Sequence, residues 1–212
     1  MNKSSSTVSI VDDDQSVCKG LARLLRVSGF VVKTYDSATA FLKDAAPDGP
    51  SCVILDVHMP ELTGLELQSE LNRSGRDEQI IFITAHPAVP MSVQAMKGGA
   101  VDFLIKPFQE AELVAAIERA LLRSSEQRRH RVTRNAARSR LDTLTYREFE
   151  VLQHVVAGLL NKQIADELNS AIGTIKVHRG RVMEKLGVTS VADLVRLVEV
   201  AGAYAPNKTK VV

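Results

Sequence analysis

This sequence lacks the features of membrane-spanning, secreted and zinc-binding proteins. It contains two cysteines, and no apolar run approaches the ~20 residues that a transmembrane helix requires. Its serine-rich start lacks the apolar core of a signal peptide. Two cysteines without histidines at ligand spacing cannot form a zinc site, and Cys18 and Cys52 fall in a predicted helix and a predicted buried strand. We therefore expect a cytoplasmic protein with reduced thiols.

Glycine-rich phosphate loops are absent as well. Neither GxGxxG nor GxxxxGK[ST] occurs in the sequence. These two motifs cradle the phosphates of dinucleotides and nucleoside triphosphates, so a nucleotide cofactor has no support.

Length and charge instead indicate two domains. The 212 residues exceed the ~150 that are typical of one domain. Residues 1–122 carry 11 Lys and Arg against 16 Asp and Glu, whereas residues 123–142 carry 7 Arg against 2 acidic residues. We expect an acidic first domain (1–122), an arginine-rich, partly helical linker (123–142) that extends the preceding helix and then becomes mobile, a mildly basic second domain (143–205) and a poorly ordered tail (206–212). The basic half suits a polyanionic partner.

Four short apolar runs in the first half each end at a polar residue. The runs are Val8–Val11 before Asp12, Cys52–Leu55 before Asp56, Ile80–Ile83 before Thr84, and Val101–Ile105 before Lys106. Such short β-branched runs, separated by amphipathic stretches, indicate buried strands of a parallel sheet. With a further strand near 31–35, the alternation predicts an α/β domain with a flavodoxin-like, doubly wound, five-stranded sheet. Helices are expected near 15–28, 37–45, 64–74, 90–98 and 109–122.

The polar residues that follow these strands should meet at one edge of the sheet, where ligands of such folds bind. Clustered carboxylates repel one another unless a cation joins them, and hard oxygen ligands suit Mg2+. A carboxylate beside Mg2+, a hydroxyl and a lysine forms a site that can receive a phosphoryl group on Asp56. The alternative is that these are ordinary polar residues in loops at strand ends.

These motifs resemble the response-regulator receiver domain of bacterial two-component signalling over residues 7–122. The resemblance rests on Val11-Asp12-Asp13-Asp14, Leu55-Asp56-Val57-His58-Met59-Pro60 with Gly64, Thr84-Ala85, and Phe103 to Phe108. It implies that Asp56 is the phosphoacceptor and that Asp12, Asp13, Asp56 and the backbone carbonyl of His58 hold Mg2+.

The same resemblance assigns the remaining polar and aromatic positions. Lys106 would contact the phosphoryl oxygens, the Thr84 hydroxyl would move toward them, and Phe103 would be the switch aromatic. His58 and His86 flank the expected mouth of the site, where they either tune hydrolysis or are partly exposed loop histidines.

The second half has a helical period. Thr145 and Glu148 form a capping box before the first apolar repeat, and Gly187 is placed to end the third of four short helices. An all-α bundle whose second and third helices form a helix-turn-helix is expected. The exposed face of the third helix offers Lys176, Arg179, Arg181 and Lys185 to a DNA groove and its phosphates.

Residues 141–200 resemble the LuxR-type helix-turn-helix, and the combination of domains most resembles the FixJ-like transcriptional regulators. The resemblance rests on Leu144-Thr145, Arg147-Glu148, Val151-Leu152, Asn161-Lys162, Ile164-Ala165, Thr174 to His178, and Lys185-Leu186. It implies that Lys176 and Val177 face bases. It also places Asn161, Lys162, Thr174 and Arg179 near phosphates and makes His178 a packed structural residue.

The chain departs from the LuxR-type pattern at two positions. The expected N-cap of the third helix is Ala171, and Gly180 lies within that helix on the DNA-facing side. Each departure should cost about 1 kcal/mol relative to a capping side chain or an alanine, respectively.

Together these features predict a DNA-binding transcription regulator that is switched by Mg2+-dependent phosphorylation from a sensor histidine kinase. Double-stranded promoter DNA and RNA polymerase are the expected partners, with a homodimer formed through helix four, strand five and helix five (Met91 to Leu122). No enzymatic activity is expected beyond self-phosphorylation from a donor and self-dephosphorylation. The alternatives are a regulator that ignores phosphate and a free-standing phosphoryl relay or phosphatase, which would not need a helix-turn-helix.

Overall fold

The computed structural model describes residues 6–202, and the predicted tail at 206–212 lies outside them. The chain divides into two compact units, Met1–Arg128 and Arg129–Val212. The division falls inside the segment that the sequence predicted as a linker. None of the described helices is long and apolar enough to cross a membrane.

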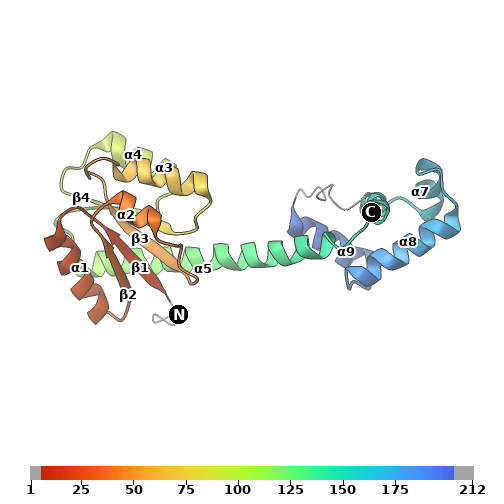
Figure 1. Cartoon of the computed structure of the whole chain (residues 1–212), viewed down its shortest axis with the longest axis horizontal. Helices are drawn as coiled ribbons and strands as arrows, with labels where there is room; N and C mark the ends of the chain where they lie inside the picture. Colours follow the sequence, from red (N-terminus) through yellow and green to blue (C-terminus); the bar gives the residue numbers. More distant parts are fainter. Residues whose placement is uncertain (1–5, 203–212) are drawn as a thin grey trace. The chain divides into compact units, whose positions relative to one another are not determined.

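The first unit is built on one all-parallel sheet (Figure 1). Its strands are β1 (Thr7–Val11), β2 (Val31–Tyr35), β3 (Ser51–Asp56), β4 (Gln79–Thr84) and β5 (Asp102–Ile105). The order β2-β1-β3-β4-β5 confirms the predicted doubly wound, five-stranded arrangement. In the register, Val11 pairs with Leu55 and Asp56 pairs with Ile83. Asp12 after β1 and the last residues of β3 and β4, Asp56 and Thr84, therefore reach the same edge.

Helices cover both faces of this sheet. They are α1 (Gln15–Val27), α2 (Ala38–Lys43), α3 (Gly64–Ser74), α4 (Val89–Lys97) and α5 (Glu110–Leu141). One core joins α1 and α5 to Ile10 and Ile54, and the other joins α2, α3 and α4 to Val11 and Leu55. Successive residues of a strand point to opposite faces, so neighbours in β1 and β3 enter different cores.

Helix α5 runs without interruption for 32 residues, from Glu110 to Leu141. The expectation that the helix gives way within 123–142 is therefore wrong. The hydroxyl of the fully buried Ser124 accepts a hydrogen bond from the Ser51 amide at 3.0 Å, and Gln127 Oε1 accepts one from Gln79 Nε2 at 2.6 Å. Further along, Ala137 and Leu141 are buried in the core of the second unit. These contacts in each unit stabilise the helix through a segment whose sequence has few apolar residues at helical spacing.

The second unit is the predicted helical bundle. After the end of α5 come α6 (Tyr146–Val156), α7 (Asn161–Glu167), α8 (Ile172–Lys185) and α9 (Val191–Ala201). The capping box of Thr145 and Glu148 is present at the start of α6. Phe149, Leu152, Ile164 and Val182 are among the residues of a single core. Helices α7 and α8 form the expected helix-turn-helix, with α8 in the position of the recognition helix.

The contact between α3 and the end of β3 generates a prediction. A Cβ at Gly64 would lie 2.3 Å from the Asp56 carbonyl oxygen and 3.1 Å from the Phe82 ring. Both neighbours belong to the packed sheet, so Gly64→Ala should lower the free energy of unfolding by about 1–3 kcal/mol, as overpacking does. Urea unfolding followed by circular dichroism measures this change.

Gly20, in the middle of α1, is the matched control. A Cβ there meets nothing within 4 Å. Gly20→Ala should therefore stabilise the protein by about 0.5–1 kcal/mol through helix propensity. Equal stability changes in the two variants would contradict the steric argument for Gly64.

Candidate functional site

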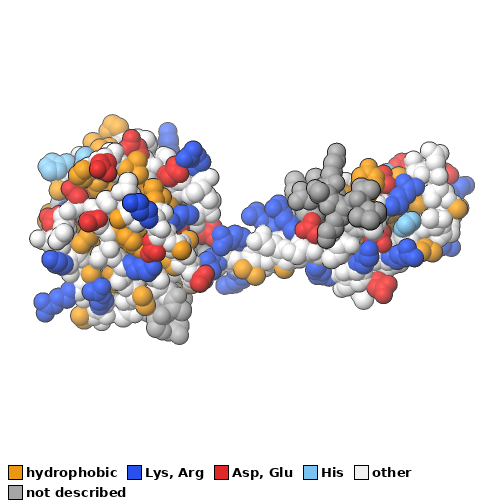
Figure 2. Space-filling model, in the orientation of Figure 1, with side chains coloured by type: hydrophobic (Ala, Val, Ile, Leu, Met, Phe, Trp, Pro, Cys, Tyr) orange, Lys and Arg blue, Asp and Glu red, His pale blue; other side chains and the backbone are white. Residues whose placement is uncertain are grey.

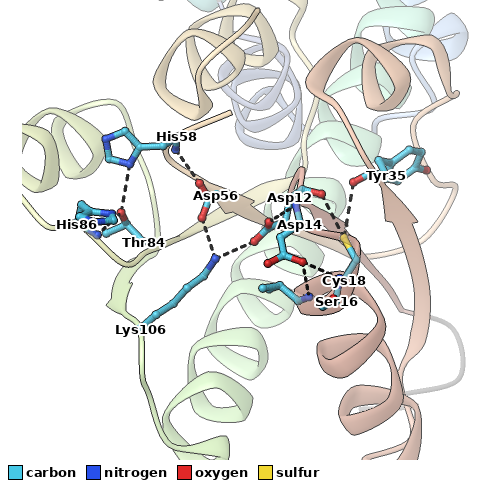
Figure 3. Close-up of polar contacts among 11 residues, drawn as sticks. Asp12, Asp14, Ser16, Cys18, Tyr35, Asp56, His58, Thr84, His86 and Lys106 are labelled. Carbon is cyan, nitrogen blue, oxygen red and sulfur yellow. Dashed lines mark hydrogen bonds and ion pairs between the residues drawn. The ribbon is translucent and has the colours of Figure 1, made fainter. Parts of the chain in front are cut away.

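A lysine ammonium lies between two buried carboxylates at the carboxyl edge of the sheet (Figure 3). Asp12 follows β1, Asp56 ends β3, and Lys106 follows β5. The Lys106 Nζ atom donates to Asp12 Oδ2 and to Asp56 Oδ1, each at 2.8 Å. The structure thus brings together three of the residues that the sequence predicted to converge. The peptide bond between Lys106 and Pro107 is cis.

The backbone fixes the other oxygen of each carboxylate. The Asp14 amide donates to Asp12 Oδ1 at 2.9 Å, and the His58 amide donates to Asp56 Oδ2 at 2.7 Å. Both aspartates are consequently held in one orientation, with their remaining oxygens turned toward Lys106. Asp14 has its own structural task, because its side chain accepts from the Ser16 amide at 2.7 Å and caps α1. The aspartate before the first helical residue was the available signal for this cap.

Burial and pairing oppose each other in this cluster. Asp12 is 1% exposed, and burial raises the pKa of its carboxyl above the usual value despite the hydrogen bond from Lys106. Burial also lowers the pKa of Lys106, but its hydrogen bonds and charge interactions with Asp12 and Asp56 outweigh this and raise it overall. Two carboxylates therefore share one ammonium, so these three side chains together carry a net negative charge when ionised.

These donors fit a hard divalent cation. Carboxylate oxygens are the ligands that Mg2+ prefers, and a second cation would offset the net negative charge of Asp12, Asp56 and Lys106 taken together. Asp13, the other predicted carboxylate ligand, is exposed. In the described part of the chain no three His, Cys, Asp or Glu side chains are already gathered in a metal-binding cluster. The Lys106 ammonium lies between two of the predicted ligands instead.

The predicted switch residues lie beside this cluster. The buried Thr84 Oγ1 accepts from the His86 amide at 3.2 Å and lies 3.4 Å from His58 Nδ1 (Figure 3). The rings of His58 and His86 meet edge to face with centroids 6.3 Å apart, and both residues are exposed. Phe103 is half-buried, with its ring 6.1 Å from that of Phe82. His58 therefore touches Asp56 through its backbone and Thr84 through its ring, which sequence reasoning had not foreseen.

The helix-turn-helix presents a basic, exposed surface. Lys162, Thr174, Lys176, Val177 and Arg181 are exposed. Figure 2 also shows Lys and Arg side chains along the second half of α5. Such a surface suits the phosphates and base edges of a DNA groove.

Two predicted phosphate contacts, Asn161 and Arg179, bond to each other, with Arg179 Nη1 donating to Asn161 Oδ1 at 3.0 Å. This bond ties the start of α7 to α8 and holds the guanidinium in one place.

The two positions at which the chain departs from the LuxR-type pattern lie where the sequence predicted them, at the start of α8 and within it. Ala171 is the N-cap and makes no side-chain cap. A Cβ at Gly180 would meet nothing within 4 Å, so the chain itself does not require glycine there.

Lys185 is the exception among the predicted DNA contacts. Its ammonium donates to Glu148 Oε2 at 2.6 Å and to the Thr143 carbonyl at 3.3 Å. Glu148 has 3% of its side chain exposed, so the pair ties the recognition helix to α6. The structure gives Lys185 a role within the fold, and its contact with DNA stays a prediction.

Comparison with known proteins accounts for both units. Residues 8–118 match the family model described as "Response regulator receiver domain", and residues 142–198 match "Bacterial regulatory proteins, luxR family". The chain is a two-component response regulator. Its receiver domain implies a sensor kinase as a partner, and its LuxR-type domain implies DNA binding.

Relatives of this response regulator share both domains over nearly their whole length. It is 44% identical to "Response regulator protein TmoT" of Ectopseudomonas mendocina, over 94% of this chain and 90% of the relative. It is 43% identical to "Transcriptional regulatory protein FixJ" of Rhizobium meliloti (strain 1021), over 95% and 98%. Among solved structures, the response regulator StyR superposes with a TM-score of 0.79 at 48% identity, covering 92% of this chain and 98% of StyR.

The ion pair between Glu148 and Lys185 generates a prediction on pH. Burial raises the pKa of Glu148, but the hydrogen bonds from Lys185 and Thr145 outweigh it and lower that pKa below 4.5. A group with a depressed pKa in the folded state stabilises the fold above its ordinary pKa, and this contribution is lost as pH falls through the folded value. Glu148→Gln should cost the second unit about 1–3 kcal/mol at pH 7 and flatten its loss of stability below about pH 4.5. Thermal unfolding of the response regulator from pH 7 to pH 3 tests both effects.

Glu150→Gln is the control on the same helix. Its ion pair with Arg147 is more exposed, with 24% of the Glu150 side chain accessible. That substitution should cost no more than about 0.5 kcal/mol. If the two glutamine variants lose stability equally, Glu148 is not the residue that ties α8 to α6.

Proposed function

We propose that this response regulator is switched by phosphorylation of Asp56 from a partner histidine kinase. The observation that carries the proposal is the sharing of Lys106 between Asp56 Oδ1 and Asp12 Oδ2. An Asp56 oxygen attacks the phosphorus of a phosphohistidine, the new O–P bond replaces the N–P bond, and the imidazole leaves. Lys106 already lies at the nucleophilic carboxylate, where it can follow and neutralise the transferred phosphoryl oxygens.

Asp12, Asp13, Asp56 and the backbone carbonyl of His58 would hold Mg2+ at this edge. Bound there, Mg2+ supplies positive charge against the oxygens of the transferring group. The geometry supports this assignment, since Asp12 and Asp56 lie on either side of a single ammonium and leave net negative charge that a divalent cation can offset.

The structural response to phosphorylation would begin at the residues around Thr84. Movement of the Thr84 hydroxyl toward a phosphoryl group on Asp56 would break its contacts with His58 and His86 and leave space for Phe103 to turn inward. This change would reshape the face formed by α4, β5 and α5, on which Val93 and Met96 are 45% and 48% exposed. We infer that this face forms a homodimer after phosphorylation.

In the dimer, two helix-turn-helix domains would bind paired half-sites in promoter DNA and act on RNA polymerase. Lys176, Val177 and Arg181 would read bases or adjacent phosphates, while Asn161, Lys162, Thr174 and Arg179 would position the domain on the backbone. We propose no catalysis beyond self-phosphorylation and self-dephosphorylation.

Asp56→Asn tests the switch. With Mg2+ and a small phosphodonor, the wild-type chain should gain one acid-labile phosphoryl group, sediment as a dimer and bind duplex DNA more tightly at fixed salt. Asp56→Asn should show none of these changes, because an amide oxygen is too weak a nucleophile to accept the group. Intact-mass measurement and sedimentation velocity report the two steps.

Asp14→Asn is the matched control, because asparagine also caps a helix and residue 14 donates to Asp12 only through its backbone. It should be phosphorylated like the wild type. Stoichiometric labelling of Asp56→Asn at the wild-type rate would rule out Asp56 as the acceptor. A phosphorylated wild type that binds DNA tightly while remaining a monomer would instead rule out the dimer.

Metal linkage gives a separate test. A ligand that binds the folded state alone raises the melting temperature by mass action, so millimolar Mg2+ should stabilise the receiver domain. Asp13→Ala should abolish this rise, because Asp13 is a proposed ligand that is exposed and therefore replaceable without disturbing the core. Differential scanning calorimetry with and without Mg2+ measures the effect. A Mg2+ response that survives Asp13→Ala would place the metal elsewhere.

A further inference from the structure

Helix α4 (Val89–Lys97) is weakly held along most of its length. Its N-cap, Ala88, provides no side-chain hydrogen bond. Ala95 is the buried residue of this fully described helix, whereas Val89 and Met96 are 77% and 48% exposed. Apart from Ala95 and the partly buried Met91, little apolar packing opposes a displacement of α4 from the sheet.

Two side chains of α3 hold the opposite, C-terminal end of α4. Gln68 Nε2 donates to the Ala95 carbonyl at 2.9 Å, and Asn72 Nδ2 donates to the Gly98 carbonyl at 2.9 Å. Carbonyls at a helix end lack intrahelical partners or share them, and side-chain amides can satisfy them. Gln68 is 3% exposed, so its bond forms away from water, where a lost partner is costly.

Gly98 is what permits this arrangement. A Cβ there would lie 2.5 Å from Gln68 Oε1 and 2.6 Å from Gln68 Cδ. Gly98 has φ −71°, a value open to any residue, so backbone strain does not demand glycine at this position. The space that glycine leaves is filled by the Gln68 amide.

The start of α3 rests on the loop that follows the proposed phosphoacceptor. The Gly64 amide donates to the Val57 carbonyl at 3.1 Å, and Gly64 packs against the Asp56 carbonyl. The other route to α4 runs from Thr84 through residues 85–88 to its first turn, with the His86 amide bonded to Thr84 Oγ1. Helix α4 is thus joined to the site at both ends, firmly through α3 and loosely through the loop after β4.

We propose that Gln68 and Asn72 are positioning residues that make the C-terminal end of α4 a fixed pivot. When Thr84 moves toward Asp56, the N-terminal end of α4 swings and its apolar face is rearranged, while the end at Gly98 stays on α3. These two hydrogen bonds, which we call the pin, also oppose displacement of the whole helix in the unphosphorylated protein, because that displacement would leave the buried Gln68 amide without its partner. The inference rests on the proposed phosphorylation switch for its trigger, but the pin itself exists in the resting chain.

Hydrogen exchange of the full chain without phosphodonor tests the pin directly. Gln68→Met keeps the length of the side chain and removes its amide, and it should speed exchange at the α4 amides at least tenfold while leaving α1 unchanged. Gly98→Ala should give the same pattern by displacing Gln68, without any substitution in α3. It therefore keeps the test valid if Gln68→Met folds poorly.

Gln127→Met is the matched control. Gln127 accepts a hydrogen bond from Gln79 at 2.6 Å, so the variant also loses an amide contact in the first unit, but one remote in sequence from α4. It should leave α4 exchange at the wild-type rate. Unchanged α4 exchange in both Gln68→Met and Gly98→Ala would overturn the proposal, as would an equal rise in α1, α4 and α5, which indicates general loss of stability.

A second experiment tests the effect of the pin on function. It compares the dimerisation of Gln68→Met and of the wild type by sedimentation, with and without phosphodonor. Gln68→Met should dimerise more without phosphodonor than the wild type does, and its response to phosphodonor should shrink at least threefold. Faster α4 exchange with wild-type dimerisation in both conditions would overturn the role of the pin in output. If the wild type itself ignores the phosphodonor, the proposed function fails, whereas selective α4 exchange in Gln68→Met still supports the pin.

Discussion

The contact on which the receiver domain depends is the Lys106 ammonium between Asp12 and Asp56. A parallel sheet brings the ends of β1 and β3 together, and the observed register therefore places two carboxylates side by side with little water. Like charges in such a place would repel strongly without a cation. The fold can keep this arrangement because the chain returns through β5 and supplies one. Lys106 offsets one of the two negative charges, and burial raises the pKa of Asp12 despite this pairing.

Much of this site could be predicted from the sequence, because its residues follow directly from strand ends. The runs before Asp12, Asp56, Thr84 and Lys106 fixed their positions at one edge, and regular sheet geometry did the rest. The helix-turn-helix could likewise be predicted from its capping box and from the helical spacing of its apolar residues. In both cases local patterns and the final fold agree.

The remaining features depend on contacts between distant segments. Helix α5 continues past residue 122 because Ser124 accepts a hydrogen bond from Ser51 and Ala137 packs in the second core. Neither contact can be predicted from the sequence of this arginine-rich segment. Lys185 looked like its exposed basic neighbours, and only the tertiary position of Glu148 distinguishes it. A glutamine in a helix predicts nothing by itself. Gln68 becomes informative when a glycine thirty residues further along the chain leaves room for it.

These distant contacts differ in kind from those at the strand ends, and the difference bears on how a signal can travel. At the acidic site two carboxylates share one lysine, so a change of charge at Asp56 would alter the electrostatic balance directly. Helix α4 has few apolar contacts and two directed hydrogen bonds, so it can move without dismantling a core. In the proposed switch, the charge change at Asp56 would be coupled to the position of α4. The two buried cores can then stay unchanged while the exposed face of α4 is altered.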